Sequence, residues 1–229
     1  MARRKLVRMS GDVREHFRYS IEEASRYLHI PLSTMKAWAR GQNYVSAKSG
    51  RSHWFAPVIE LADAQRGLLS FYNLAECHVL RATRDRNIPL INVRRALAFI
   101  REEIPSSSHP LLSHDFSTFG KSVFIKHLGD TINATRHGQK AMQQLLESYL
   151  DRIDRDALGM PIQIYPMNTN YLAINPTFSS GKPVVKGTRI MACILADRKK
   201  AGESYADLSG DYGLTHSQIE HAITEYAAS

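Results

Sequence analysis

The sequence predicts a mainly α-helical protein of the α+β class, in which short β-hairpins accompany the helices. Three observations lead to this prediction. Capping residues precede stretches whose apolar side chains recur at helical spacing, and proline or glycine ends most of these stretches. Two polar-aromatic runs also flank a Lys-Ser-Gly-Arg tip, which is typical of a β-hairpin. We expect a winged helix-turn-helix at the amino end and a three-helix unit of helix-turn-helix type at the carboxyl end.

Length and composition restrict the class of protein. The chain has 229 residues, of which 43% are hydrophobic and 23% charged, which is typical of a globular protein with a sizeable core. Cys77 and Cys193 lie far apart, which excludes a disulfide framework and a cysteine zinc site. No apolar stretch of signal-peptide or membrane-spanning length is present. We therefore expect a cytoplasmic protein that does not interact with a membrane.

The positive charge is concentrated at the amino end. The formal net charge is +8, and residues 1–105 carry all of this excess, whereas residues 106–229 are neutral overall. Residues 1–55 alone contain 11 Lys or Arg and 4 Asp or Glu. Such a density of cations indicates a surface that meets a polyanion, and nucleic acid is the polyanion we expect.

The first helical motif begins at a capping signal. Ser20 and Glu23 have capping-box spacing, so a helix is expected from Ile21 until Pro31 breaks it. Ser33 is then expected to cap a second helix that ends at Gly41. This second helix has the position of a recognition helix, which enters the major groove of DNA.

The recognition helix has an inward and an outward side. Met35 and Trp38 are expected to pack inward, and the outward residues to meet bases and phosphates, namely Ser33, Thr34, Lys36, Ala37 and Arg40. The run from residue 42 to residue 55 is expected to form the wing. Lys48 and Arg51 at its tip would contact phosphate or the minor groove, which adds affinity more than specificity.

Two further helices follow the wing. Asn73 is expected to cap the first, which ends near Pro89, and the second buries apolar residues of helical spacing, namely Val93, Ala96, Leu97 and Ile100. The Ile-Glu-Glu-Ala start, the Ile-Pro turn and the Ser-Thr-x-Lys-x-Trp helix resemble the winged helix of MerR-type regulators. The resemblance covers residues 18–105, and we take residues 1–105 as a MerR-like DNA-binding domain.

Residues 106–170 are expected to be a connecting α/β segment. Residues 122–126 are predicted to form a short strand, residues 139–155 an amphipathic helix and residues 160–166 an edge strand. Four histidines lie in or near this segment, but their spacing fits no usual metal site, so neither a metal nor a cofactor is expected.

Residues 171–229 are expected to form the three-helix unit. Thr188, Ser204 and Thr215 are predicted to cap its helices, with breaks at Gly202 and Gly213. Its cations are a possible second DNA-binding or dimer surface: Lys186, Arg189, Arg198, Lys199 and Lys200.

The carboxyl-terminal segment resembles the family known as domain of unknown function 433. The resemblance rests on Gly-Lys-Pro-Val-Val-Lys-Gly-Thr-Arg-Ile, then Ala-Gly-Glu-Ser, then Tyr-Gly-Leu-Thr, within residues 172–227. Met191 and the Ser209-Gly210 pair depart from the family pattern. Joined to an amino-terminal winged helix, this segment is similar to the larger VapB-type antitoxins of type II toxin-antitoxin systems. That resemblance implies a PIN-domain or PIN-like ribonuclease toxin as the partner.

Two hypotheses follow from the sequence. The first is an antitoxin that neutralises a PIN-like toxin and represses its own promoter as a homodimer on double-stranded operator DNA. The alternative is a MerR-like regulator that responds to a ligand bound among aromatic residues between Phe116 and Tyr171. The helix near residues 145–150 is one candidate for the toxin-facing surface. No enzymatic activity is expected, because no catalytic motif is present.

Overall fold

The computed structural model describes residues 11–16, 18–45, 50, 52–105, 108–128 and 136–228. It has the predicted α+β class, with many helices and short antiparallel strand pairs. No helix within these described ranges is long and apolar enough to cross a membrane.

The helix-turn-helix begins where the capping box predicted. Helix α1 (Ile21–Tyr27) starts after Ser20, whose hydroxyl accepts the Glu23 N–H at 3.1 Å while the Glu23 carboxylate accepts the Ser20 N–H at 2.9 Å. Strand β1 (Tyr19–Ser20) pairs with β4 (Leu68–Leu69) beside it. The pairing with β4 therefore holds the residues that directly precede α1.

Helix α2 (Leu32–Arg40) begins two residues earlier than predicted. The prediction that Ser33 caps this helix is wrong, because Pro31 occupies the cap position and its carbonyl accepts the Met35 N–H at 3.0 Å. The proline already has the extended ψ of a cap residue, at 136°, so the chain becomes helical at the next residue.

The predicted wing is present as an antiparallel hairpin. Strand β2 (Gln42–Val45) pairs with β3 (Ser52–Phe55), and Gln42 lies opposite Phe55. Gly41 joins α2 to the hairpin with φ at +76°, and a Cβ there would lie 2.3 Å from the Phe55 carbonyl oxygen. Glycine is required at this junction because both the backbone angle and the close approach exclude a side chain.

Helices α3 (Phe71–Asp85) and α4 (Leu90–Glu103) follow the wing. Ser70 caps α3, and Asn73 is its capping-box partner rather than the cap itself. Helix α4 buries all four residues predicted for its inner side. Its Arg94 supports the base of the wing, because Nε donates to the Ala56 carbonyl at 2.8 Å and the guanidinium lies 4.7 Å from the Phe55 ring centre.

The middle segment is more helical than predicted. A 3₁₀ turn η1 (Pro110–Leu112) and a π-helical turn η2 (Phe116–Gly120) lead into α5 (Lys121–His127), where a strand was predicted. Phe124 and Ile125 of α5 are buried in the main core between α4 and α7 (Arg136–Leu150). Tertiary burial thus decides the conformation of a short apolar run whose periodicity is ambiguous.

Helix α7 ends at Leu150, before the predicted end near residue 155. The next residues form strand β5 (Ile153–Arg155), which pairs with β6 (Pro161–Ile164). One apolar core runs from Tyr19 to Ile174 through all these elements, so it does not divide at the boundary predicted at residue 105.

The carboxyl-terminal unit has its own smaller core. Strands β7 (Leu172–Ala173) and β8 (Val184–Val185) pair around the 3₁₀ turn η3 (Ser179–Gly181) and precede α8 (Ala192–Lys200), α9 (Tyr205–Tyr212) and α10 (His216–Ala227). The predicted caps Ser204 and Thr215 are confirmed. Thr188 is not a cap, because its hydroxyl donates to the Val185 carbonyl within a turn and α8 starts only after Met191.

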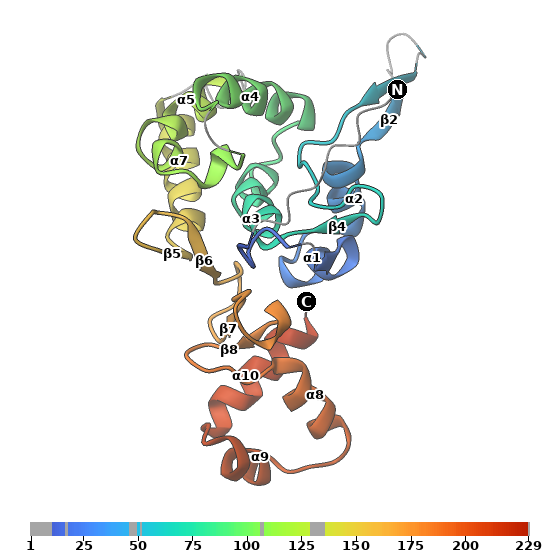
Figure 1. Cartoon of the computed structure of the whole chain (residues 1–229), viewed down its shortest axis with the longest axis vertical. Coiled ribbons are helices and arrows are strands. Elements are labelled where there is room, and N and C mark those ends of the chain that lie inside the picture. The colour runs from blue at the N-terminus through green and yellow to red at the C-terminus, as the bar shows by residue number, and fades with distance from the viewer. Residues whose placement is uncertain are drawn as a thin grey trace.

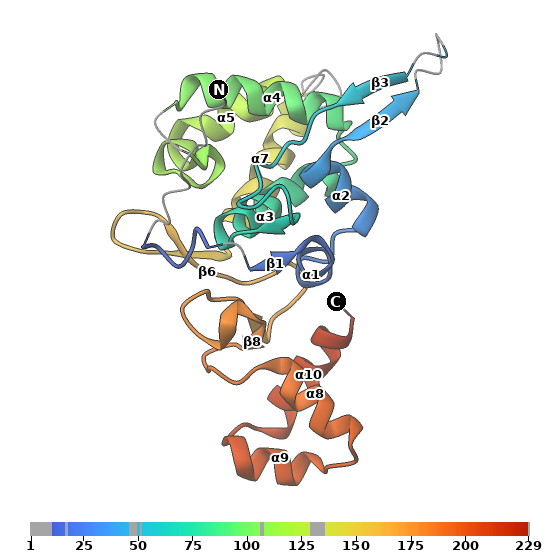
Figure 2. The same ribbon diagram turned by 45° about the vertical axis from the view of Figure 1, so that its right-hand side comes forward.

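The two cores meet beside α1. Figures 1 and 2 show α8–α10 below the larger body, with the end of α10 next to α1 and the β2–β3 hairpin projecting at the far side. Tyr226 packs against both cores, and Arg18 Nη1 donates to the Pro176 carbonyl at 2.8 Å. The helix-turn-helix therefore lies between the wing and the carboxyl-terminal unit.

Candidate nucleic-acid interface

Helix α2 presents most of its predicted outward residues. Ser33, Lys36 and Arg40 are exposed and Thr34 is half-buried. The prediction for Ala37 is wrong, because its side chain is only 6% exposed and lines a pocket between α2 and the turn that joins α3 to α4. The inward prediction is confirmed, since Met35 and Trp38 are almost fully buried in the main core.

The two cations of α2 differ in their surroundings. Lys36 Nζ lies 3.7 Å from Glu22 Oε1 of α1, and both side chains are about half exposed. Arg40 has no ion pair within the described ranges, and its guanidinium passes over Gly67, where a Cβ would lie 2.8 Å from Nη2. One cation is thus partly neutralised by a neighbour, while the other is available to a phosphate.

The wing carries exposed apolar side chains that sequence analysis did not single out. Val45 is 62% exposed, Trp54 60% and Tyr44 46%. Tyr44 and Phe55 share one face, with ring centres 5.5 Å apart. The predicted contact residues Lys48 and Arg51 lie outside the described residues. The aromatic and apolar residues at the end of both short polar runs, Tyr44-Val45 and Trp54-Phe55, were the available signal for these side chains.

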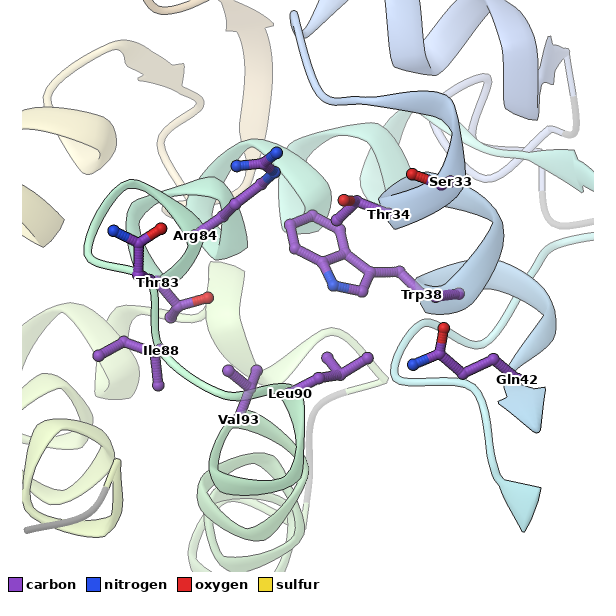
Figure 3. Close-up of a pocket in the computed structure, with 11 residues that line it drawn as sticks. Ser33, Thr34, Trp38, Gln42, Thr83, Arg84, Ile88, Leu90 and Val93 are labelled. Carbon is purple, nitrogen blue, oxygen red and sulfur yellow. The ribbon is translucent and has the colours of Figure 1, made fainter. Parts of the chain in front are cut away.

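A pocket of about 380 Å³ opens next to α2. Figure 3 shows Ser33, Thr34, Trp38 and Gln42 on one side of it, and Thr83, Arg84, Ile88, Leu90 and Val93 on the other. The Trp38 ring extends from α2 into this space. Among the residues that the structure describes, Arg84 is the only charged one that lines the pocket, and sequence analysis missed it. A basic residue in the last turn of an otherwise buried helix was the available signal.

Of the five cations predicted as a second surface, only Arg198 is ion-paired within the described ranges, while Lys186, Arg189 and Lys199 contact an aromatic ring or a carbonyl. Arg198 forms ion pairs with Glu203 and with Asp211, the latter at 2.5 Å, and lies over the Tyr212 ring. Lys199 Nζ donates to the Glu203 carbonyl at 3.0 Å. Lys186 lies over the Tyr165 ring and Arg189 over the Phe178 ring, whereas Lys200 is exposed.

Helices α9 and α10 of the same unit are acidic, whereas a helix that enters a DNA groove is expected to be basic. Residues 201–229 contain five Asp or Glu and no Lys or Arg. Asp207, Asp211 and Glu220 on α9 and α10 are exposed. The exposed carboxylates of Asp207 and Glu220 would repel DNA phosphates, so the electrostatics favour the amino-terminal helix-turn-helix as the nucleic-acid interface.

Other predicted sites in the middle segment belong to the core. Phe116, Phe124 and Tyr149, which were to line a ligand pocket, are fully buried by packing. Leu146 and Tyr149 of α7 are buried as well, so the apolar side of that helix is not a free surface for a toxin. Within the described ranges, no group of three His, Cys, Asp or Glu residues has an arrangement that could hold a metal.

Buried titratable groups in the core are structural. His78 Nε2 lies 3.0 Å from the Tyr149 carbonyl oxygen, and burial lowers the pKa of His78 to about 3. Burial also raises the pKa of the Cys77 thiol well above its usual range. Both groups are therefore neutral at physiological pH, and the thiol is unreactive.

Two known families match separate parts of the chain. Residues 18–97 match the family described as "Putative DNA-binding HTH domain". The chain carries a helix-turn-helix domain. Residues 172–227 match the family described as "Protein of unknown function (DUF433)".

Relatives from Mycobacterium tuberculosis (strain ATCC 25618 / H37Rv) extend over nearly the whole chain. "Putative antitoxin VapB45" is 26% identical over 241 residues, covering 96% of this chain and all of the relative. "Uncharacterized protein Rv2308" is 26% identical over 220 residues, covering 90% of this chain and 88% of the relative. The crystal structure of Rv2018 from the same species has a similar fold, with a TM-score of 0.65 and 23% identity over 90% of this chain and 96% of that one.

Proposed function

We propose that this chain is the DNA-binding antitoxin of a type II toxin-antitoxin pair. It neutralises a PIN-like ribonuclease toxin and represses its own promoter. The observation that carries this proposal is the similarity over the full length to a relative named as an antitoxin, together with the helix-turn-helix domain. The function needs no catalytic residue and no cofactor, and it places the protein in the cytoplasm.

The proposed DNA contacts come from α2 and the wing. Ser33, Thr34, Lys36 and Arg40 would enter the major groove, and Lys48 and Arg51 would contact phosphate from the hairpin. Arg84 at the end of α3 supplements this surface, because it lines the same pocket as Ser33 and Thr34. A homodimer would read a palindromic operator with half-sites about one helical turn apart, or a multiple of that distance.

The toxin would bind a surface other than α2. The exposed carboxylates of α9 and α10 suit a protein partner better than DNA, since neither helix contains a lysine or an arginine. With separate surfaces for DNA and for the toxin, one chain could bind the operator and the toxin at the same time.

Footprinting and co-purification test the two parts of the proposal. The purified chain should protect a two-fold symmetric site in its own promoter, and the protein encoded by the adjacent reading frame should co-purify with it. An unprotected promoter would refute autorepression. Absence of a complex when both proteins are co-expressed would refute neutralisation by binding.

The second candidate function is a ligand-responsive regulator of MerR-like type. The pocket beside α2 favours it, because a small molecule there would lie against the recognition helix. An adjacent frame that encodes a small protein with the carboxylates of a magnesium-dependent nuclease would favour the antitoxin, since a ligand sensor needs no such neighbour.

A further inference from the structure

The pocket beside α2 has apolar walls of the kind that hold small molecules. The Trp38 indole, Ile88, Leu90 and Val93 supply these walls, and Trp38 is only 3% exposed. Its volume of about 380 Å³ falls within the usual range for small-molecule sites, roughly 300–1,000 Å³. The walls come from α2, from α4 and from the turn before α4, and all four side chains pack in or against the main core.

Polar groups without partners surround these walls. The hydroxyls of Ser33 and Thr34, the amides of Gln42 and Asn87 and the indole N–H of Trp38 line the pocket, and in the described part of the chain none of them forms a side-chain hydrogen bond. A few such groups converging on an apolar cavity are what fix the orientation of a bound ligand. Their hydrogen-bonding capacity is left for water or a ligand.

The charge of the pocket selects for an anion. The Arg84 guanidinium has no ion pair or hydrogen bond within the described ranges, and no carboxylate from those ranges lines the pocket. Its neighbours are engaged elsewhere, since Arg81 donates to the Leu28 carbonyl and Arg86 to the Ala141 carbonyl. Arg84 is therefore a guanidinium that has no counter-ion in the described part of the chain and lies beside the apolar walls of the pocket.

We propose that this pocket binds a small organic anion with a flat apolar body, of the class of the aromatic carboxylates. The carboxylate pairs with Arg84, and the ring lies against Trp38 and Leu90. The hydroxyls and amides on the rim orient the ligand.

Occupancy of the pocket is coupled to DNA binding, a consequence that rests on the proposed function. Ser33 and Thr34 belong to the first turn of α2, and Gln42 begins the wing, so the ligand touches both parts of the DNA-binding surface. A carboxylate on Arg84 also removes a cation from that surface. The bound anion therefore lowers the affinity for operator DNA, and by reciprocity DNA lowers the affinity for the anion.

Binding is tested with 2-naphthoate, using 2-naphthamide as its neutral match. The W54F variant leaves Trp38 as the single tryptophan, and Trp54 is on the exposed wing outside the pocket. Calorimetry measures affinity, and the single indole N–H signal in a ¹H–¹⁵N spectrum locates the probe. We expect naphthoate to bind and shift this signal, and naphthamide to bind about tenfold more weakly.

Arg84→Gln and Arg86→Gln form a matched pair of variants. Both arginines are exposed, but only Arg84 lines the pocket, so R84Q should weaken naphthoate binding about tenfold and R86Q by less than about twofold. An unshifted indole signal, or equal affinity of R84Q and the parent, would overturn the proposal. In either case the pocket would be no more than a part of the DNA-binding surface.

The DNA measurement separates the two claims. Naphthoate should weaken operator binding of the parent protein and leave that of R84Q unchanged. If naphthoate binds in the pocket but no DNA is bound, the site is established and the proposed function fails. If naphthoate and operator DNA bind without affecting each other's affinity, the coupling is refuted.

Discussion

Truncation of Lys36 and Arg40 tests the surface of α2 most sharply. Neither K36A nor R40A should unfold the protein, because both side chains are exposed. Lys36 has only the 3.7 Å pair with Glu22, and at that distance in water the attraction is about 1 kcal/mol before the loss of side-chain entropy and salt screening are counted. Measured exposed pairs of this kind contribute ~0.2–1 kcal/mol to stability.

The effect on DNA affinity should be larger. Each truncation should weaken operator binding by ~1–3 kcal/mol if the side chain reads a guanine, and by less if it contacts phosphate. A phosphate contact would also reduce the slope of affinity against salt concentration by about 1. Glu22→Gln should act in the opposite direction, because it removes the carboxylate that competes with phosphate for Lys36.

Fluorescence anisotropy with a labelled promoter fragment, repeated at several salt concentrations, measures these effects. Lys140→Ala is the control, since Lys140 is an exposed cation on α7. Unchanged affinity in both K36A and R40A would refute the assignment of α2 as the recognition helix. An equal loss in K140A would mean that only overall charge matters.

Three further predictions concern stability. Ser204→Ala removes the cap of α9 and should lower the free energy of unfolding by ~1 kcal/mol, measured by urea titration. Gly181→Ala should lower the melting temperature far more than Gly187→Ala. Both positions have positive φ, but only at Gly181 would a Cβ clash, because it would lie 2.2 Å from the Tyr19 hydroxyl. Equal losses in melting temperature would disprove the clash. The pKa of His78 is about 3 in the folded protein, against an ordinary value of 6.5. Between these two pH values the unfolded chain binds more protons than the folded one. The free energy of unfolding should therefore fall as the pH drops from about 6.5 towards 3. His78→Gln should flatten this decline in urea titrations at pH 7 and pH 5, and an unaltered slope would exclude His78 as its source.

Local signals in the sequence predicted much of the fold. The caps at Ser20, Ser204 and Thr215 are as predicted, because a capping box depends only on residues three apart. The wing is as predicted because a Lys-Ser-Gly-Arg tip separates two polar-aromatic runs, and the inner side of α4 because its apolar spacing reflects which face is buried. Such features need no knowledge of the remaining chain.

The errors arise where tertiary contacts decide. The run at residues 122–126 has β-forming residues but is helical, because α4 and α7 bury Phe124 from two sides. Thr188 has the sequence of a cap but closes a turn onto Val185. Ala37 faces a pocket made by the end of α3, about 50 residues further along the chain, which the local pattern could not reveal. Arg84 was missed for the same reason.

Growth of a host that expresses the adjacent reading frame tests the central claim most directly. The chain is supplied in trans from a second promoter that it cannot regulate, so rescue cannot arise from repression. We predict growth arrest by the neighbouring protein alone, and normal growth when this chain is also present. Arrest that this chain does not relieve, or no arrest at all, would contradict the antitoxin function and leave a promoter-binding regulator.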